Sequence, residues 1–305
     1  MRKKTAIAAK KTNRWWEPYI LVTPMLIMMG VLFLYPICKS VLMAFQDFKL
    51  TAMNNVRFNG LENFSTLFKD KYIMRVLGNS LLMTPILVLV STALGLAIAF
   101  ALNKDIPLRG LFQTVIFLPS AISGFISAIA FRWMANGEYG VFNDLLMNVF
   151  HLTDEKLPFL SSPSLAMFLV VLATVWLGTP SYAMTLLAAM QSVPRELEEA
   201  AEIDGCNALR RAVHITLPFI KPTFIMLFLL KFIWSFNYLD IVSTATSGGP
   251  AMSTMTLPMY MYSLGFTTWD FGRSAALGLL VLAGLAAFVS MYMRVTGYEK
   301  ESESQ

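Results

Sequence analysis

Runs of apolar residues without Asp, Glu, Lys or Arg divide this chain into segments long enough to cross a bilayer. A hydrocarbon core of about 30 Å needs roughly 20 apolar residues in helical form. Charge-free or nearly charge-free runs of that length recur along the whole sequence. They predict six membrane-spanning helices, at about 18–45, 76–102, 110–134, 165–190, 219–242 and 271–293. Prolines inside these runs are expected to kink the helices without ending them.

The segments between these runs are of two kinds. The stretch from Ile241 to Trp269 is uncharged after Asp240 and long enough to span, but its centre reads STATSGGPAMST. Ser, Thr, Gly and Pro at this density favour a loop with short helical pieces. The other segments are polar: an N-terminal arm over 1–17, a loop over 192–218 and a tail over 294–305. The pattern predicts an all-α integral membrane protein with one transmembrane domain over 18–293.

Composition supports this class. Hydrophobic residues make up 56% of the 305 residues and charged residues only 14%, and the mean hydropathy is +0.59. About a quarter of the residues in a soluble domain are charged, and disordered or coiled-coil chains need high net charge or a heptad composition. Soluble, disordered and fibrous classes are therefore excluded.

The basic residues orient the predicted helices. The first span is preceded by six cations and opposed only by Glu17; the cations are Arg2, Lys3, Lys4, Lys10, Lys11 and Arg14. The positive-inside rule then places the N-terminus in the cytoplasm, and six spans return the C-terminus to the same side. The loops over 103–109 and 191–221 also fall inside, and they contain six further Lys and Arg residues. Segment 46–75 is an exception, because this outer loop carries five cations and three acidic residues.

The sequence lacks several short motifs that are typical of nucleotide-binding, metal-binding and catalytic sites. The chain has no phosphate-binding G-x-x-x-x-G-K-[ST] loop, so it is not expected to hydrolyse ATP by itself. It also lacks H-E-x-x-H, C-x-x-C and G-x-S-x-G, and its two histidines are isolated. We therefore expect no catalytic residue, metal or cofactor in this chain.

The loop over 192–218 carries strong helix signals. Glutamates after Pro194 complement the positive end of a helix dipole, and Gly205 then breaks the pattern. A second helical stretch begins at Asn207, a residue that favours N-caps. We expect a short helix, a glycine turn and another helix outside the bilayer.

The spacing in this loop resembles the EAA loop of permease subunits of binding-protein-dependent ABC importers. All fixed positions of that motif are present, at Glu199, Ala200, Ala201, Gly205, Ile215, Leu217 and Pro218. The phrases ELEEAAEIDG, FNYLD with TSGGP, and GLENFSTLF are similar to the carbohydrate branch, which includes the maltose and glycerol-phosphate permeases. The resemblance extends from about Pro18 to the end of the chain.

This resemblance implies a type I importer fold and a set of partners. The EAA segment would be a coupling helix that docks on an ATPase subunit, with Ala200 and Ala201 allowing close approach and Glu199 offering a carboxylate. The implied partners are a second homologous permease, two ATP-binding subunits that hold ATP and Mg²⁺, an extracellular or periplasmic solute-binding protein and a sugar. The implied location is the bacterial plasma (inner) membrane, with several spans and no role for nucleic acid.

The fifth predicted span carries candidates for the transport path. Ionisable residues inside a span are costly and are functional candidates, and Lys231 lies near the middle of this one. Aromatic, amide and carboxylate groups follow it, and the candidate set is Lys231, Trp234, Asn237, Tyr238 and Asp240. Such groups suit a sugar, and the lysine favours an acidic or phosphorylated one. An interfacial aromatic belt would explain Trp234 and Tyr238 equally well.

Two other functions remain open at this stage. A secondary sugar transporter or channel acting alone would be expected to show more spans or an inverted repeat. A membrane enzyme would need a polar cluster that no local segment supplies. The coupling-loop spacing favours the ABC permease over both.

Overall fold

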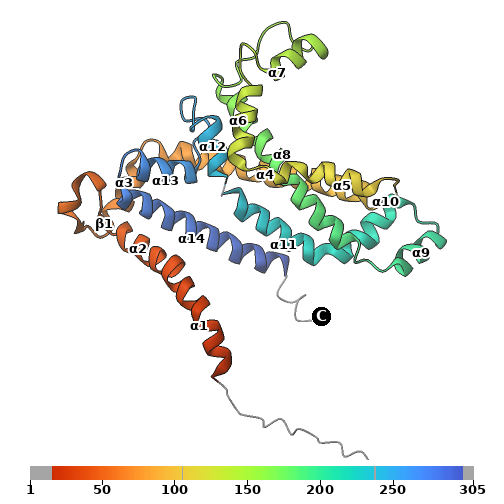
Figure 1. Cartoon of the computed structure of the whole chain (residues 1–305), viewed down its shortest axis with the longest axis horizontal. Coiled ribbons are helices and arrows are strands. Elements are labelled where there is room, and N and C mark those ends of the chain that lie inside the picture. The colour runs from red at the N-terminus through yellow and green to blue at the C-terminus, as the bar shows by residue number, and fades with distance from the viewer. Residues whose placement is uncertain (1–15, 105, 237, 298–305) are drawn as a thin grey trace, which may run out of the picture.

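The computed structural model describes residues 16–104, 106–236 and 238–297, and most of them are helical (Figure 1). Within these ranges five continuous apolar helices are long enough to cross a bilayer, over Tyr19–Ala44, Ile73–Leu102, Pro163–Met190, Ala208–Ser235 and Phe271–Thr296. Their components are α1 Glu17–Met29 with α2 Tyr35–Ala44, α4 Ile73–Leu102, α8 Pro163–Met190, α10 Ala208–Arg211 with α11 Leu217–Ser235, and α14 Phe271–Thr296. Most of the predicted arm 1–17 and of the tail 294–305 lies outside the described residues.

The predicted span 110–134 is a bent pair of helices and not one straight helix. Helix α5 covers Arg109–Phe117, a 3₁₀ turn covers Leu118–Ala121, and α6 covers Gly124–Met134. The two helical segments meet at 92°. Pro119 removes a backbone donor at the turn, and Ser123 starts α6 anew because its Oγ accepts from the Ile126 N–H at 3.3 Å. Counted as one broken span, this pair brings the total to six.

The fifth span is shifted along the chain relative to the predicted 219–242. It begins at Ala208, because Asn207 Oδ1 caps the helix by accepting from the Arg210 N–H at 2.9 Å, and a π-helical turn over Ala212–Thr216 carries it into α11. It ends at Ser235, and a separate short helix, α12, covers Leu239–Ala245. An apolar run in the sequence shows how far a hydrophobic segment extends. It does not show where one apolar helix ends and the next apolar helix begins.

Helices α4 and α8 form the centre of the bundle. Leu87 and Leu169 are completely buried in a core to which α6 and α12 also contribute. At Gly95 the two helices approach so closely that a Cβ would lie 2.7 Å from the Tyr182 ring. By contrast, the most apolar part of the α1–α2 helix is not buried at all, and this helix projects away from the bundle (Figure 1). Its exposed apolar surface suits lipid or another subunit.

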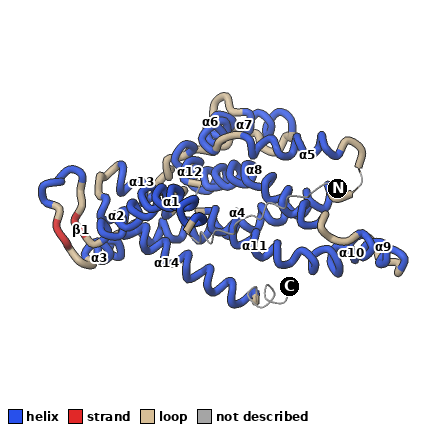
Figure 2. Tube along the Cα trace, turned by 60° about the horizontal axis from the view of Figure 1, so that its bottom comes forward, coloured by secondary structure: helices blue, strands red, loops and turns tan. Residues whose placement is uncertain are grey.

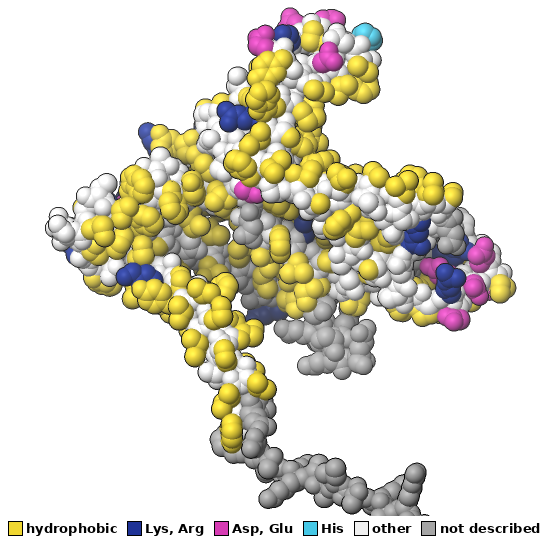
Figure 3. Space-filling model, viewed as in Figure 1, with side chains coloured by type: hydrophobic (Ala, Val, Ile, Leu, Met, Phe, Trp, Pro, Cys, Tyr) yellow, Lys and Arg dark blue, Asp and Glu magenta, His cyan; other side chains and the backbone are white. Residues whose placement is uncertain are grey.

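Polar segments mark the two ends of the bundle. Helix α9, Arg195–Ile203, lies at one end, and a short hairpin of β1 Gln46–Asp47 and β2 Arg57–Phe58 lies at the other, next to α3 Glu62–Lys69 (Figures 1 and 2). An arm containing α7 Val141–Asp144 extends from α6, and α13 Leu257–Phe266 precedes α14. Apolar side chains cover much of the surface in between, whereas charged side chains gather around α9 and at the tip of the arm (Figure 3).

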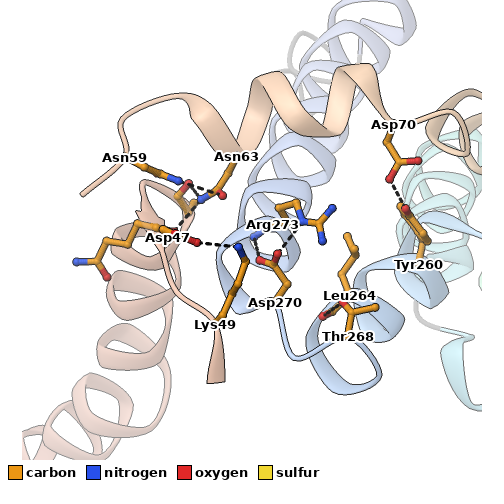
Figure 4. Close-up of polar contacts among 12 residues, drawn as sticks. Asp47, Lys49, Asn59, Asn63, Asp70, Tyr260, Leu264, Thr268, Asp270 and Arg273 are labelled. Atoms are coloured by element: carbon orange, nitrogen blue, oxygen red, sulfur yellow. Dashed lines mark hydrogen bonds and ion pairs between the residues drawn. The ribbon is translucent and has the colours of Figure 1, made fainter. Parts of the chain in front are cut away.

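The hairpin end is held together by buried polar contacts (Figure 4). Asn63 Nδ2 donates to the Ala44 and Gln46 carbonyls, both at 2.9 Å. Asp270 is 4% exposed and accepts from Arg273 Nε at 2.7 Å. The Asn63 contacts fix α3 against the end of α2 and the hairpin, and the Asp270 contact closes the first turn of α14.

A second contact at this end joins two segments far apart in the sequence. The Tyr260 hydroxyl on α13 donates to the Asp70 carboxylate (Figure 4). Burial, and then this hydrogen bond, raise the pKa of Tyr260, so the phenol stays protonated and remains a donor at neutral pH.

We expect Asn63→Ala to lower the free energy of unfolding by about 1–3 kcal/mol, because it removes the side-chain donor to the buried contact with the Ala44 carbonyl and one of the two donors to the Gln46 carbonyl. Thermal unfolding in detergent measures the change. Thr66→Ala is the matched control, because Thr66 is exposed on the same helix and surface changes of this kind stay within about 0.5 kcal/mol. Equal unfolding temperatures for the two variants would contradict the prediction.

Candidate functional site

The polar loop over 192–218 forms a defined helix and turn. Helix α9 carries Glu196 and Glu198 in its first turn, where carboxylates stabilise the helix dipole. It ends at Ile203, and Gly205 follows two residues later with a φ of +80°, in the left-handed region that glycine adopts without steric cost. The Cys206 N–H then donates to the Ala201 carbonyl at 2.9 Å and closes the turn. The predicted helix and glycine turn are both present.

The motif residues of this loop fall into two groups. Glu199, Ala200, Gly205 and Pro218 are exposed. Ala201 is 7% exposed, and Ile215 and Leu217 pack against the core cluster at this end of α4, α8 and α11. The expectation that Ala201 offers its surface to a partner therefore does not fit its position. One group anchors the loop to the bundle, and the other is presented to solvent.

An ion pair ties α9 to the helix that follows. Arg211 Nη1 lies 2.7 Å from Glu202 Oε2. Because α10 continues into α11, Glu202 connects α9 directly to a membrane-spanning helix. A displacement of α9 would therefore act on the fifth span without an intervening flexible linker.

Lys231 is buried but lies near the end of α11 and not in mid-span, four residues before Ser235. The side chain is 6% exposed, and its Nζ donates to the Tyr238 hydroxyl at 3.4 Å. Both groups occupy space next to Gly178 on α8, where a Cβ would lie 2.5 Å from Nζ and 2.7 Å from the hydroxyl. The lysine has no carboxylate within ion-pair distance among the described residues.

The other candidates for the transport path do not join Lys231 in one cluster. Trp234 is 61% exposed, and Asn237 lies outside the described residues. Asp240 is exposed, and its carboxylate packs on Gly124, the first residue of α6, where a Cβ would lie 1.9 Å from Oδ2. The structure brings Lys231 and Tyr238 together and places Asp240 against the start of α6.

Two helix breaks meet at this point. The bend between α5 and α6 and the interruption between α11 and α12 are neighbours, since Asp240 touches Gly124 and α12 packs along α6 (Figure 1). Broken helices at membrane depth occur where the chain is buried in protein or lines a cavity, and they are typical of transporter binding sites.

Sequence reasoning missed the two glycines in this region. Gly124 and Gly178 lie in other predicted spans, and an isolated glycine in an apolar run carries no signal for the side chain that occupies its space. In the residues that the structure describes, no three His, Cys, Asp or Glu side chains lie close enough together to hold a metal ion.

Known proteins resemble this chain over most of its length. A family model for the binding-protein-dependent transport system inner membrane component matches residues 91–296. A sulfoquinovosyl glycerol transport system permease protein of Agrobacterium fabrum is 30% identical over 276 residues, which cover 90% of this chain and 89% of that protein. An sn-glycerol-3-phosphate transport system permease protein of Yersinia pseudotuberculosis is 30% identical over 270 residues, covering 88% and 90%.

The fold also matches a solved structure. A chain of a bacterial ABC transporter involved in the import of the acidic polysaccharide alginate superposes with a TM-score of 0.81 at 21% identity, covering 93% of this chain and 96% of that one. The family match includes the loop with α9 and the spans on either side of it.

Proposed function

Since this chain belongs to the family of binding-protein-dependent transport system inner membrane components, we propose that it is the permease subunit of a bacterial ABC importer for a sugar or oligosaccharide. The observation that carries the proposal is α9, which presents Glu199 and Ala200 to solvent at one end of the bundle and is linked to a spanning helix through Glu202 and Arg211. A rigid, exposed helix of this kind can receive a force from outside the membrane and pass it to α11.

The proposed partners follow from the family and from this geometry. Two separate subunits would bind and hydrolyse ATP, and one of them would dock on α9. A second permease would complete the pathway, and the exposed α1–α2 helix offers it a large apolar surface. A solute-binding protein would deliver the sugar on the outer side of the inner membrane. In this arrangement the α9 end is cytoplasmic, in accordance with the basic residues around it.

We propose that the transported sugar is anionic. Among the described residues, the buried ammonium group of Lys231 donates to a neutral phenol and has no carboxylate within ion-pair distance, and a buried charge of this kind is costly unless it is paired. A sulfonate, phosphate or carboxylate on the substrate would pair with it. The names of the two relatives support this choice, because one denotes a sulfo-sugar glycoside and the other a phosphate ester.

Co-purification and reconstitution test the proposal. An affinity-tagged chain is expected to bring down an ATPase pair and a second permease, and proteoliposomes of that complex should take up sugar only with internal ATP and the binding protein outside. Calorimetry on the binding protein with sn-glycerol 3-phosphate, glucuronate and neutral maltose then tests the charge of the substrate. Autonomous uptake by the purified chain would instead establish a secondary transporter or channel.

A further inference from the structure

Arg109 is the least satisfied charged group that the structure describes. It is the first residue of α5, and its Nε and Nη2 atoms are buried without any hydrogen-bond partner. The guanidinium group cannot lose its proton at accessible pH, so burial without an acceptor is unfavourable. The site that Arg109 creates requires an anionic acceptor.

The start of α5 has no side-chain cap either. Leu108, the residue at the N-cap position, has a left-handed φ of 59° and gives no side-chain cap. The first turn contains no acidic residue, although carboxylates stabilise exactly this part of a helix through its free N–H groups and dipole. A single carboxylate placed here would satisfy both the guanidinium group and the helix end.

A carboxylate of the required kind faces Arg109 across a groove. Arg109 and α9 line the same open groove, of about 520 Å³. Glu198, Glu199 and Glu202 of α9 line it too, and of these three Glu198 is partly buried whereas Glu199 and Glu202 are exposed. Because Glu198 precedes the buried Ala201 by three residues, the two side chains share the more buried face of α9. Glu202 is already paired with Arg211.

We propose that Arg109 is a positioning residue for energy coupling, which binds the Glu198 carboxylate when α9 is displaced toward the bundle. The inference rests on the proposed function, since it is the docked ATPase that displaces α9. Through this pair α9 acts on α5, which leads across the 92° bend into α6. Coupling then reaches two spans, the continuous fifth through Glu202 with Arg211 and the broken third through Glu198 with Arg109.

A charge exchange in the full reconstituted complex tests the pair. Arg109→Glu and Glu198→Arg, each alone, are expected to lower ATP hydrolysis stimulated by the binding protein by about tenfold, and the double exchange should restore most of it, since contacting charges couple strongly. A purely structural role for Arg109 would leave the double exchange as inactive as the single ones. Glu196→Gln, on the exposed face of the same helix, is the matched control and should behave like the wild type.

Cross-linking gives a second measurement that does not depend on activity. Arg109→Cys with Glu198→Cys, in a chain whose Cys38 and Cys206 are replaced by serine, should cross-link more with ATP and vanadate than without nucleotide. Two results together would overturn the inference: no rescue by the charge exchange, and cross-linking that does not depend on nucleotide. The same two results are expected if a carboxylate of the ATPase, and not Glu198, binds Arg109. If the wild-type complex itself shows no ATP hydrolysis stimulated by the binding protein, the proposed function is contradicted instead.

Discussion

Uptake is expected to fall to background when Glu199→Ala and Gly205→Val are combined, while the protein still inserts into the membrane. Valine at a φ of +80° is strained, because the left-handed region costs an ordinary residue about 1–2 kcal/mol and a β-branched one more. The strain lies in the turn that sets the direction of α9, outside the spanning helices. Removal of Glu199 also takes away an exposed carboxylate that a basic group on the ATPase can bind.

The measurement compares ATP-dependent uptake with the amount of protein in the membrane fraction. The control combines Glu196→Ala with Gly297→Val. Gly297, at the end of α14, also has a left-handed φ, of +65°, so valine there strains the backbone outside the α9 turn. This control should retain most uptake. Normal uptake by the Glu199 and Gly205 variant would exclude α9 as the coupling element.

Hydrophobic length predicts the spans well and their breaks poorly. The prediction of an all-α membrane protein with six spans is confirmed when the bent pair α5–α6 is counted as one span beside the five continuous ones, because burial of about 20 apolar residues in lipid outweighs local preferences. A kink at Pro119 was predicted, but not a 92° bend at which one helix ends and another begins, and the end of α11 at Ser235 was not predicted. Both breaks lie within apolar sequence, and neighbouring helices satisfy the freed backbone groups there, so hydropathy does not change at either break.

The loop over 192–218 was more predictable than the transport path. Its signals are local: Gly205 and Asn207 determine a turn and a cap within a few residues. The environment of Lys231 depends on Gly178 of another helix, and that pairing is set by the packing of the whole bundle. Ala201 illustrates a smaller error, since the motif spacing gives no sign that this alanine faces inward while Ala200 faces solvent.

Lys231→Met is expected to separate stability from transport. The substitution removes a buried cation that has no anionic partner, and replacing such charges by apolar groups of similar size is often neutral or stabilising. The variant should therefore unfold at the same temperature as the wild type or at a higher one. Loss of a charge-assisted hydrogen bond to the substrate costs about 1.5–3 kcal/mol, so the apparent affinity for an anionic sugar should fall about 10- to 100-fold.

The test measures the concentration dependence of uptake for the anionic sugar that the binding protein selects, alongside thermal unfolding of the same preparations. Lys39→Met is the matched control, because Lys39 also lies in a spanning helix but is exposed, and its uptake should match the wild type. A variant that is destabilised and loses transport in proportion would show that Lys231 serves the packing against Gly178. Unchanged affinity and uptake in Lys231→Met would remove the lysine from the transport path and, with it, the argument from this structure for an anionic substrate.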